Sequence, residues 1–223
     1  CLYHETGKGH PESQERFIAV EHALRVKGLL NEQTELLSSK ATLHDLTLCH
    51  SPSYIHKVIN EISALKKDEI KILSTGDVCI AHGSLDSALS GVGAALAAVD
   101  AIVNGLTEKI FVNTRPPGHH ASKDAGMGFC IFNNIAFCAL RILTTTPIKK
   151  ILIIDFDVHH GNGTQDIFYE DPRVFYFSIH QEGIYPGTGF SDETGYGEGV
   201  GTTLNCPILP TSSSENEAMR AFH

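Results

Sequence analysis

Residues 150–170 read KILIIDFDVHHGNGTQDIFYE, and this stretch decides the fold class. Its first six residues form a continuous apolar run that ends in an aspartate, as in a parallel strand covered by helices on both faces. A short helix is expected over residues 163–170, and the next apolar strand over residues 174–179. A strand, a helix and a second strand in this order predict an α/β fold with a mainly parallel sheet.

The same alternation extends to both sides of this stretch. Further strands are expected over residues 109–114 and 202–208, with an apolar helix over 130–143 between the strand at 109–114 and the central one. Earlier in the chain we expect helices within residues 11–30, 45–65 and 84–104, with Ser51 and Pro52 as the N-cap and first helical position of one of them. Gly91 and Gly93 in the helix at 84–104 predict close packing against a sheet.

Composition narrows the class of protein further. The chain has 223 residues, enough for one domain with a substantial core, and 17 Lys+Arg against 26 Asp+Glu give a net charge of −9. This acidic balance argues against sequence-independent binding to nucleic acid, which needs clustered basic residues. The six cysteines form no CxxC pair, which favours reduced thiols, and 13 histidines make metal or proton chemistry worth testing.

The sequence also bears on location. The first ten residues are polar and glycine-rich, without the apolar core of a secretory signal. The most apolar long stretch, residues 89–103, contains Asp100 and falls short of a membrane span. We therefore expect a cytoplasmic protein, or a nuclear one if the source is eukaryotic, that is not secreted and does not bind a membrane. The oligomeric state is left open.

Polar, glycine-rich loops follow three of the predicted strands. They read RPPGHHA at residues 115–121, DFDVHHGNG at 155–163 and HQEGIYPGTG at 180–189. In an open parallel sheet, ligands bind beyond the carboxyl ends of the strands. These three loops are therefore the predicted site.

Asp157 and His159 give the strongest case for a metal ligand pair. Residues two apart in an extended segment point to the same side, so a carboxylate and an imidazole can share one ion. Zinc accepts this mixture, and a catalytic zinc takes three protein ligands and keeps a position open for water. The plainer alternative is that Asp157 caps a helix and His159 packs under a loop.

The adjacent residues His119 and His120 are better suited to proton transfer than to joint metal ligation, because neighbouring side chains diverge. A histidine that acts as a general base needs a partner for its other ring nitrogen. Asp155 and Asn162 are the candidate partners, and a carboxylate would favour the imidazolium form whereas an amide would not. The plainer alternative is that both are hydrogen-bonded loop histidines.

Four motifs in this order and spacing resemble one family: RPPGHHA, GFCIFNNIA, DFDVHHGNGTQDIFY and YPGTG. They resemble the zinc-dependent histone deacetylases of the arginase–deacetylase fold, a family that includes acetylpolyamine and acetoin-utilisation proteins. The resemblance runs from GKGHPES near residue 10 to about residue 208. Asn162 is similar to the class II and bacterial branch, since class I typically has Asp there. The resemblance implies a three-layer αβα fold with a doubly wound sheet.

The resemblance also implies the roles of individual residues. Asp157 and His159 would bind one zinc ion, His119 and His120 would handle protons of water and leaving group, and Asp155 and Asn162 would orient these two histidines. Gly128, Phe129 and Tyr185 would line the tunnel for the acyl-lysine stem, and Asp77 would hold the substrate backbone at the rim. The Ser178 hydroxyl with main-chain oxygens near Asp155, His159 and Ile179 resembles an inner potassium site. The segments at Phe168, Asp171 and Val174 resemble an outer one.

The implied reaction removes acetyl groups from lysine side chains of a peptide, and zinc with the His119/His120 pair activates the water. One alternative is the same chemistry on a small acetylated amine such as a polyamine. A third hypothesis is an inactive deacetylase-like module that binds or scaffolds.

The third hypothesis rests on the residues after Pro210. The family has a second Asp ligand in a GFDAH-like segment and an oxyanion-stabilising Tyr in a GGY-like segment, whereas this chain continues with TSSSENEAMRAFH. We therefore expect residues 1–223 to be the N-terminal portion of a single deacetylase domain, inactive when alone. The last residues, from the serines at 212–214 onward, predict the start of a helix.

Overall fold

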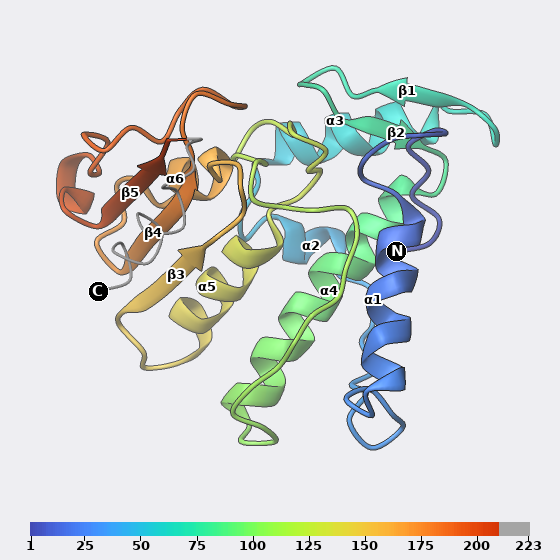
Figure 1. Cartoon of the computed structure of the whole chain (residues 1–223), viewed down its shortest axis with the longest axis horizontal. Helices are drawn as coiled ribbons and strands as arrows, with labels where there is room; N and C mark the ends of the chain where they lie inside the picture. The colour runs from blue at the N-terminus through green and yellow to red at the C-terminus, as the bar shows by residue number, and fades with distance from the viewer. Residues whose placement is uncertain (210–223) are drawn as a thin grey trace. The chain divides into compact units, whose positions relative to one another are not determined.

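The computed structural model describes residues 1–209, and its contacts divide the chain into two compact units, Cys1–Thr146 and Pro147–His223 (Figure 1). The helix predicted near the end of the chain lies outside the described residues.

The first unit is mainly helical. Its elements are α1 (Gln14–Val26), α2 (Leu43–Leu46), α3 (Pro52–Ser63), β1 (Ile70–Ile72), β2 (Cys79–Ala81), α4 (Ser84–Val103) and α5 (Asn134–Thr145). The start of α3 is as predicted, because the Ser51 side chain accepts the Tyr54 N–H at 3.3 Å and Pro52 is the first helical residue. The sequence did not predict the short antiparallel pair of β1 and β2.

Helix α4 is the core helix of the first unit. It packs against α3 and α5, and its buried face is formed largely by alanine, valine and glycine. By length and composition α4 could cross a membrane, but 56% of its most apolar window is buried, as in the core helix of a globular protein. A Cβ on Gly93 would lie 2.0 Å from the Ser39 carbonyl oxygen, so the glycine admits a backbone that passes directly over the helix.

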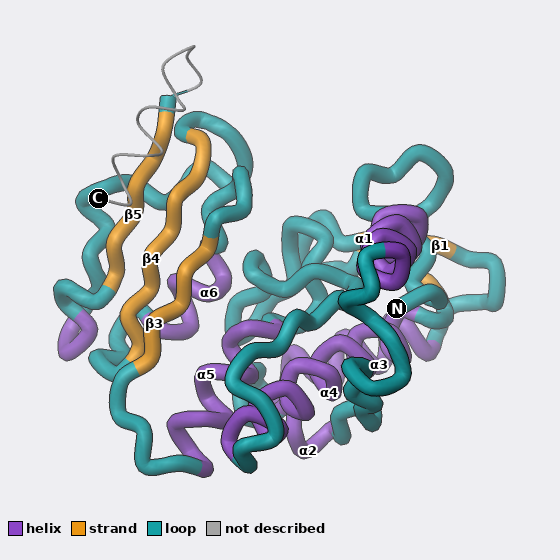
Figure 2. The backbone as a smooth tube through the Cα atoms, turned by 60° about the horizontal axis from the view of Figure 1, so that its bottom comes forward, coloured by secondary structure: helices purple, strands orange, loops and turns teal. Residues whose placement is uncertain are grey.

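The prediction of a strand at residues 109–114 is wrong. The segment is extended and runs along α4, but it is a loop and no strand among the described residues pairs with it (Figures 1 and 2). A strand needs a hydrogen-bonded neighbour as well as an apolar sequence. The small residues of α4 accordingly pack against extended loops, where a sheet had been predicted: a Cβ on Gly91 would lie 2.7 Å from the Thr114 hydroxyl.

The second unit contains the predicted parallel sheet. Its elements are β3 (Ile151–Asp155), α6 (Asn162–Phe168), β4 (Val174–Gln181), the 3₁₀ helix η1 (Gly197–Gly199) and β5 (Thr203–Ile208). The strand order is β3-β4-β5, all parallel, with Asp155 beside Ser178 at the carboxyl end of the β3–β4 pair. The predicted strand and helix bounds agree with these to within two residues.

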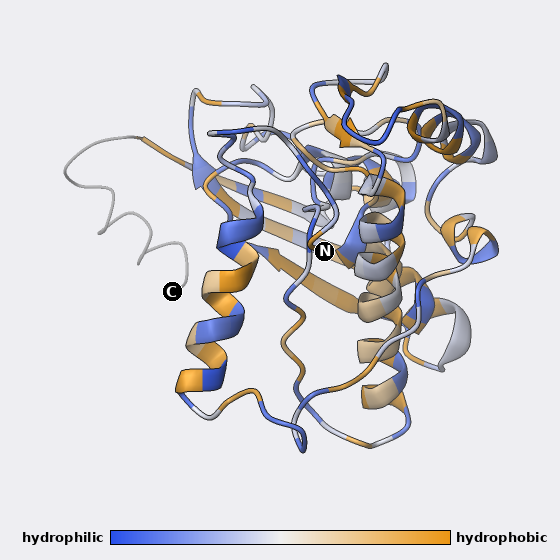
Figure 3. Cartoon of the chain, turned by 90° about the vertical axis from the view of Figure 1, so that its right-hand side faces the viewer, coloured by the Kyte–Doolittle hydropathy of each residue, from blue (hydrophilic) through white to orange (hydrophobic). Residues whose placement is uncertain are grey.

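One face of this sheet is covered within the described residues. Helix α6 packs on β4, and Figure 2 shows α6 behind the three strands. Ile153 and its neighbour Tyr176 are buried. Leu152 and Ile154, which point to the other face, are 58% and 47% exposed. Figure 3 shows how apolar these strands are. Within the second unit, the described residues thus place a helix on one face of the sheet.

Candidate active site

In the first unit, a buried ion pair anchors the loop that carries His119 and His120. The Arg115 guanidinium donates two hydrogen bonds to the Glu12 carboxylate, from Nε to Oε1 and, at 2.8 Å, from Nη2 to Oε2. Its Nη1 donates to the Cys1 carbonyl at 3.0 Å. The residue that opens the RPPGHH loop is thus fixed to the N-terminal segment by a charge-assisted pair in a buried place.

The two histidine rings of this loop lie side by side. Their centroids are 4.1 Å apart with 45° between the planes, and His120 is buried whereas His119 is half-buried. The turn at Gly128 and Phe129 packs directly on His120. Gly128 has φ +54°, and a Cβ there would lie 2.2 Å from His120 Cδ2. Only glycine fits at this position, so the GFC motif is explained by the close approach of the turn to the imidazole.

Asp77 holds this turn. Its Oδ1 accepts the Gly128 N–H at 2.6 Å, across 51 residues of sequence. Phe129 has φ +68°, an uncommon conformation for an aromatic residue, and its ring meets His10 edge to face at 4.6 Å. Sequence reasoning missed His10, although it lies in the GKGHPES motif. The predicted contact of Asp77 with a substrate backbone stays a prediction.

His50 supports the same region, although no pattern in the sequence pointed to it. Its Nδ1–H donates to the Ser122 carbonyl at 2.8 Å, and its Nε2 accepts the Asn133 N–H at 3.0 Å. Burial lowers the pKa of His50 to about 4. His50 is therefore a neutral structural histidine that supports residues 121–133.

In the second unit, Asp157 and His159 lie together after β3, as predicted. Asp157 Oδ1 is 3.1 Å from His159 Nδ1 and also accepts the His159 N–H at 2.8 Å. Helix α6 has Gly161 as its N-cap, so Asp157 does not cap it. Within residues 1–209 no group of three or more His, Cys, Asp or Glu side chains is arranged to hold a metal. This unit thus contributes one carboxylate and one imidazole, a donor set that suits zinc.

Asp155 and Asn162 lie where the sequence placed them, at the end of β3 and the start of α6. Asp155 Oδ2 accepts the Tyr176 hydroxyl at 3.1 Å, and its Oδ1 accepts the Asp157 N–H at 3.2 Å. Asp155 therefore fixes the backbone of the Asp157 segment. Its pairing, and that of Asn162, with the histidines of the first unit stays a prediction.

Tyr185 lies close to the candidate metal pair. Its ring is nearly perpendicular to that of His159, with the centroids 6.3 Å apart, and the residue is 37% exposed. The second unit therefore brings an accessible aromatic side chain beside the imidazole, as a tunnel wall would require. Its predicted position opposite Phe129 stays a prediction.

The two predicted potassium sites contain oxygen atoms that suit this ion, and potassium binding there stays a prediction. Ser178 is buried, and its hydroxyl lies 2.8 Å from His180 Nδ1. In the α6–β4 connection, the Asp171 carboxylate is engaged by Arg173 at 2.6 and 2.8 Å, and this hydrogen bonding lowers the pKa of Asp171. An ion at Phe168, Asp171 and Val174 would therefore depend on main-chain oxygens.

Two further histidines of the second unit, His160 and His180, are buried with ring centroids 4.8 Å apart. Burial and, to a smaller extent, the neighbouring His180 lower the pKa of His160 to about 4. Burial also lowers the pKa of His180. Burial thus disfavours the charged form of both rings, and sequence reasoning gave neither of them a role.

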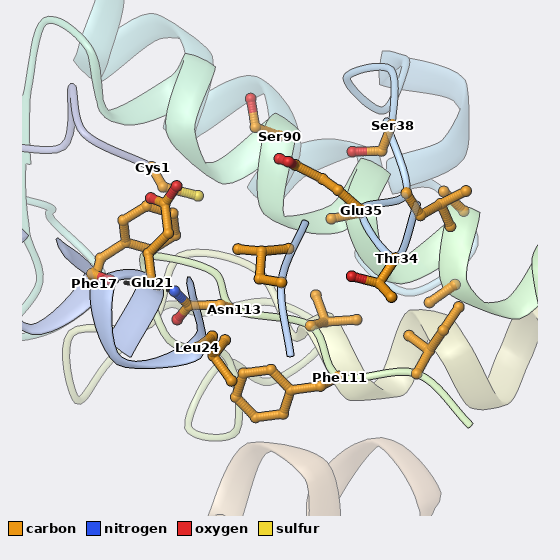
Figure 4. A pocket seen from close by; sticks show the side chains of 17 residues that line it. Cys1, Phe17, Glu21, Leu24, Thr34, Glu35, Ser38, Ser90, Phe111 and Asn113 are labelled. Atoms are coloured by element: carbon orange, nitrogen blue, oxygen red, sulfur yellow. Dashed lines mark hydrogen bonds between the residues drawn. The ribbon is translucent and has the colours of Figure 1, made fainter. Parts of the chain in front are cut away.

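A cavity of about 410 Å³ lies elsewhere in the first unit (Figure 4). Its walls come from α1, α4, residues 30–38 and the extended segment at 110–113, and most of them are apolar. None of the residues predicted for the active site lines it. The cavity is therefore separate from the candidate chemistry.

Comparison with known proteins gives a consistent result. Residues 10–223 match the family described as the histone deacetylase domain. A protein of Archaeoglobus fulgidus named "Probable deacetylase" is 38% identical over 220 residues, which cover 98% of this chain and 59% of that protein. The human protein named "Polyamine deacetylase HDAC10" is 37% identical over 221 residues, covering 95% of this chain and 32% of that protein. The chain thus spans less than two thirds of the length of either relative.

Among solved structures, the HDA15 HD domain matches with a TM-score of 0.85 and 33% sequence identity, over 93% of this chain and 61% of that one. This match confirms the predicted α/β fold of the arginase–deacetylase type.

Proposed function

Because the chain belongs to the histone deacetylase family, we propose that it carries one part of a metal-dependent amidohydrolase site that removes acetyl groups from lysine side chains. The observation that carries this proposal is the Asp157–His159 pair, whose oxygen and nitrogen lie 3.1 Å apart in the loop after β3. A deacetylase needs such a mixed donor pair in a place that substrate can reach. Both side chains are about half exposed, which meets this requirement.

Asp157 and His159 would hold zinc, as their chemistry fits that ion. When bound, the metal supplies polarisation of the acetyl carbonyl and a lower pKa for its water. Asp155 keeps the Asp157 backbone in place, because the Asp155 carboxylate accepts a hydrogen bond from the Asp157 N–H. Potassium ions would bind at an inner site beside Ser178 and at an outer site in the Phe168–Val174 segment.

His119 and His120 would move the protons of this reaction. One imidazole takes a proton from the attacking water, and an imidazolium donates a proton to the departing amine nitrogen as the C–N bond breaks. The products are acetate and the free amine. The contact between the two tilted rings and the Gly128 turn on His120 would hold these groups in one orientation. Asp155 and Asn162 would set the protonation state of the two rings.

Substrate binding would use Gly128, Phe129 and Tyr185. Aromatic rings pack well on the methylene groups of a lysine stem, whose acylated end carries no charge. The partner would then be an acetylated lysine peptide in the cytoplasm or, in a eukaryote, the nucleus. Asp77 would act at the rim of this site.

A second candidate substrate is a small acetylated amine. The observation that favours it is the similarity to the human protein whose name is polyamine deacetylase. The acidic net charge of −9 is compatible with a cationic amine. This alternative shares the chemistry of the first and differs only in the leaving amine.

One assay on the complete gene product separates these proposals. Acetate release is measured with an acetyl-lysine peptide and with N-acetylputrescine, before chelation, after chelation and after Zn²⁺ is restored. Zinc-dependent release from the peptide supports the lysine deacetylase, and release from acetylputrescine alone supports the amine deacetylase. Zinc binding with no release from either substrate would refute both and favour the binding or scaffold module.

A further inference from the structure

A hydrogen-bond network joins buried side chains of the second unit to residues 182–193, which we call the Tyr185 loop. Its side chains come from the loop before α6, from α6 itself, from β4 and β5, and from the Tyr185 loop. They are His160, Gln165, His180, Thr188, Glu193 and Asn205.

The direction of each hydrogen bond can be derived from the carboxylate. Glu193 can only accept, so the Gln165 amide nitrogen donates to its Oε2 at 2.5 Å and Gln165 Oε1 is the acceptor. His160 Nε2 lies 3.0 Å from that Oε1 and therefore carries the hydrogen. Nδ1 of the neutral ring then accepts the Thr188 hydroxyl at 2.8 Å. Both nitrogens of His160 are used by side chains, and one of them binds the Tyr185 loop.

His180 holds the next residue of the loop. Its Nε2 is 3.1 Å from the Gly189 carbonyl oxygen, to which it must donate, and its Nδ1 accepts the Ser178 hydroxyl at 2.8 Å. The Gly189 N–H donates to Glu193 at 3.1 Å. Thr188 and Gly189 together therefore have a side chain, an amide and a carbonyl fixed by this network.

Gly189 also shows how closely the loop approaches the two rings. Its φ is +88°, and a Cβ there would lie 2.5 Å from His160 Cγ and 2.6 Å from His180 Nε2. The glycine of YPGTG thus lets the backbone rest on both imidazoles, in a conformation that other residues rarely adopt.

The network connects two parts of the candidate site. His160 directly follows His159 in the chain, and Thr188 follows Tyr185 by three residues. We propose that His160 and His180 are positioning residues that fix the Tyr185 loop, and so set the Tyr185 ring relative to His159. This inference rests on the proposed function for its catalytic meaning, whereas the hold on the loop is a property of the chain alone.

The experiment uses Thr188→Val, which removes the hydroxyl but keeps the shape, with Thr188→Ser as the conservative rescue. Thr144→Val is the matched control, since Thr144 is exposed on α5 in the first unit. Amide hydrogen exchange of residues 182–193 is compared with that of β4. We expect exchange in the loop to accelerate about fivefold in Thr188→Val, the factor for a net hydrogen bond of about 1 kcal/mol. Thr188→Ser restores the wild-type rate and Thr144→Val leaves it unchanged.

A second measurement uses the absence of tryptophan from the chain. Tyr185→Trp introduces one tryptophan, which can be excited selectively over the five remaining tyrosines of this chain, and Thr188→Val in that background should increase its quenching by acrylamide. If exchange rises equally in β4 and the loop, or if Thr188→Ser fails to restore it, the network only supports the core and the proposal is overturned.

Kinetics of the complete gene product with native Tyr185 separate the hold on the loop from its effect on catalysis. We expect Thr188→Val to raise KM for the acetyl-lysine peptide more than it lowers kcat, with Thr188→Ser again restoring the wild-type values. A kcat loss with unchanged KM would overturn the assigned effect on Tyr185. Absence of hydrolysis in the wild type would refute the proposed function, while the exchange data would still decide whether the network holds the loop.

Discussion

The chain contains two His–His dipeptides in loops, and the second ring of each is held by a contact of its own. In both pairs the first ring is half-buried and the second is buried. His120 is covered by the backbone turn at Gly128, which packs on the carbon edge of its ring. His160 has both ring nitrogens bonded to the side chains of Thr188 and Gln165. In the first unit, His119 and His120 are thus both candidates for proton transfer. In the second unit, His159 is a candidate metal ligand and His160 holds the neighbouring loop.

Loss of a candidate metal ligand should produce the largest effect. In the complete gene product we expect His159→Ala to abolish metal binding and turnover, a loss greater than the roughly 100-fold typical of changes to outer-shell partners. The measurements are zinc content by mass spectrometry and acetate release. Asp192→Ala, an exposed carboxylate of the same unit, is the control and should retain both. Full zinc content in His159→Ala would show that the second dipeptide does not supply a metal ligand.

His120→Ala tests the other dipeptide. We expect a fall in kcat of about 10²–10⁴-fold, the usual contribution of general acid–base catalysis, with nearly unchanged zinc content. The two variants should therefore differ in their zinc content, which His120→Ala retains and His159→Ala loses. If His120→Ala lost zinc instead, the roles of the two pairs would have been assigned wrongly.

The strands of the second unit could be predicted from sequence because an apolar run reports burial directly. The segment at 109–114 also contains an apolar run, Ile110 to Val112. An apolar run does not show whether a neighbouring strand pairs with it, and none does among the described residues. The pairing of Asp157 with His159 could be predicted because the two residues are only two positions apart in an extended segment, where such side chains point to the same side. The contact of Asp77 with Gly128 spans 51 residues, and that of Asn205 with Gln165 spans 40. Contacts of this range give no local signal, so neither the bond from Gly128 to Asp77 nor the hydrogen-bond network around His160 was predicted.

A smaller effect is expected when Asp77, in the first unit, is replaced. Asp77→Ala removes the acceptor of the Gly128 N–H, a charge-assisted bond, so we expect the turn to loosen and KM to rise about tenfold. Asp77→Asn keeps an oxygen acceptor and should recover most of the loss. If Asp77 acts mainly on the turn, the peptide and acetylputrescine should be affected alike. An effect confined to the peptide would favour the rim role and contradict the turn-holding role.

The smallest expected effect is on the free energy of unfolding, which we expect to depend on pH because His50 is buried in a structural role. The folded pKa of His50 is about 4, below the ordinary 6.5, because burial disfavours the charged ring. Protonation would also place a second N–H against the Asn133 N–H. The unfolded chain therefore binds more protons between these values, so stability is full above pH 6.5 and declines as pH falls towards 4.

From this one histidine we expect the free energy of unfolding to fall by about 1 kcal/mol between pH 6 and pH 5. Urea unfolding at constant ionic strength measures the slope, and His50→Gln keeps an acceptor for the Asn133 N–H but cannot titrate. The difference between the two slopes isolates His50 from every other titrating group. Equal slopes would mean that the buried ring gains its proton as easily as the unfolded one, and the neutral hydrogen-bond pattern of His50 would then be wrong.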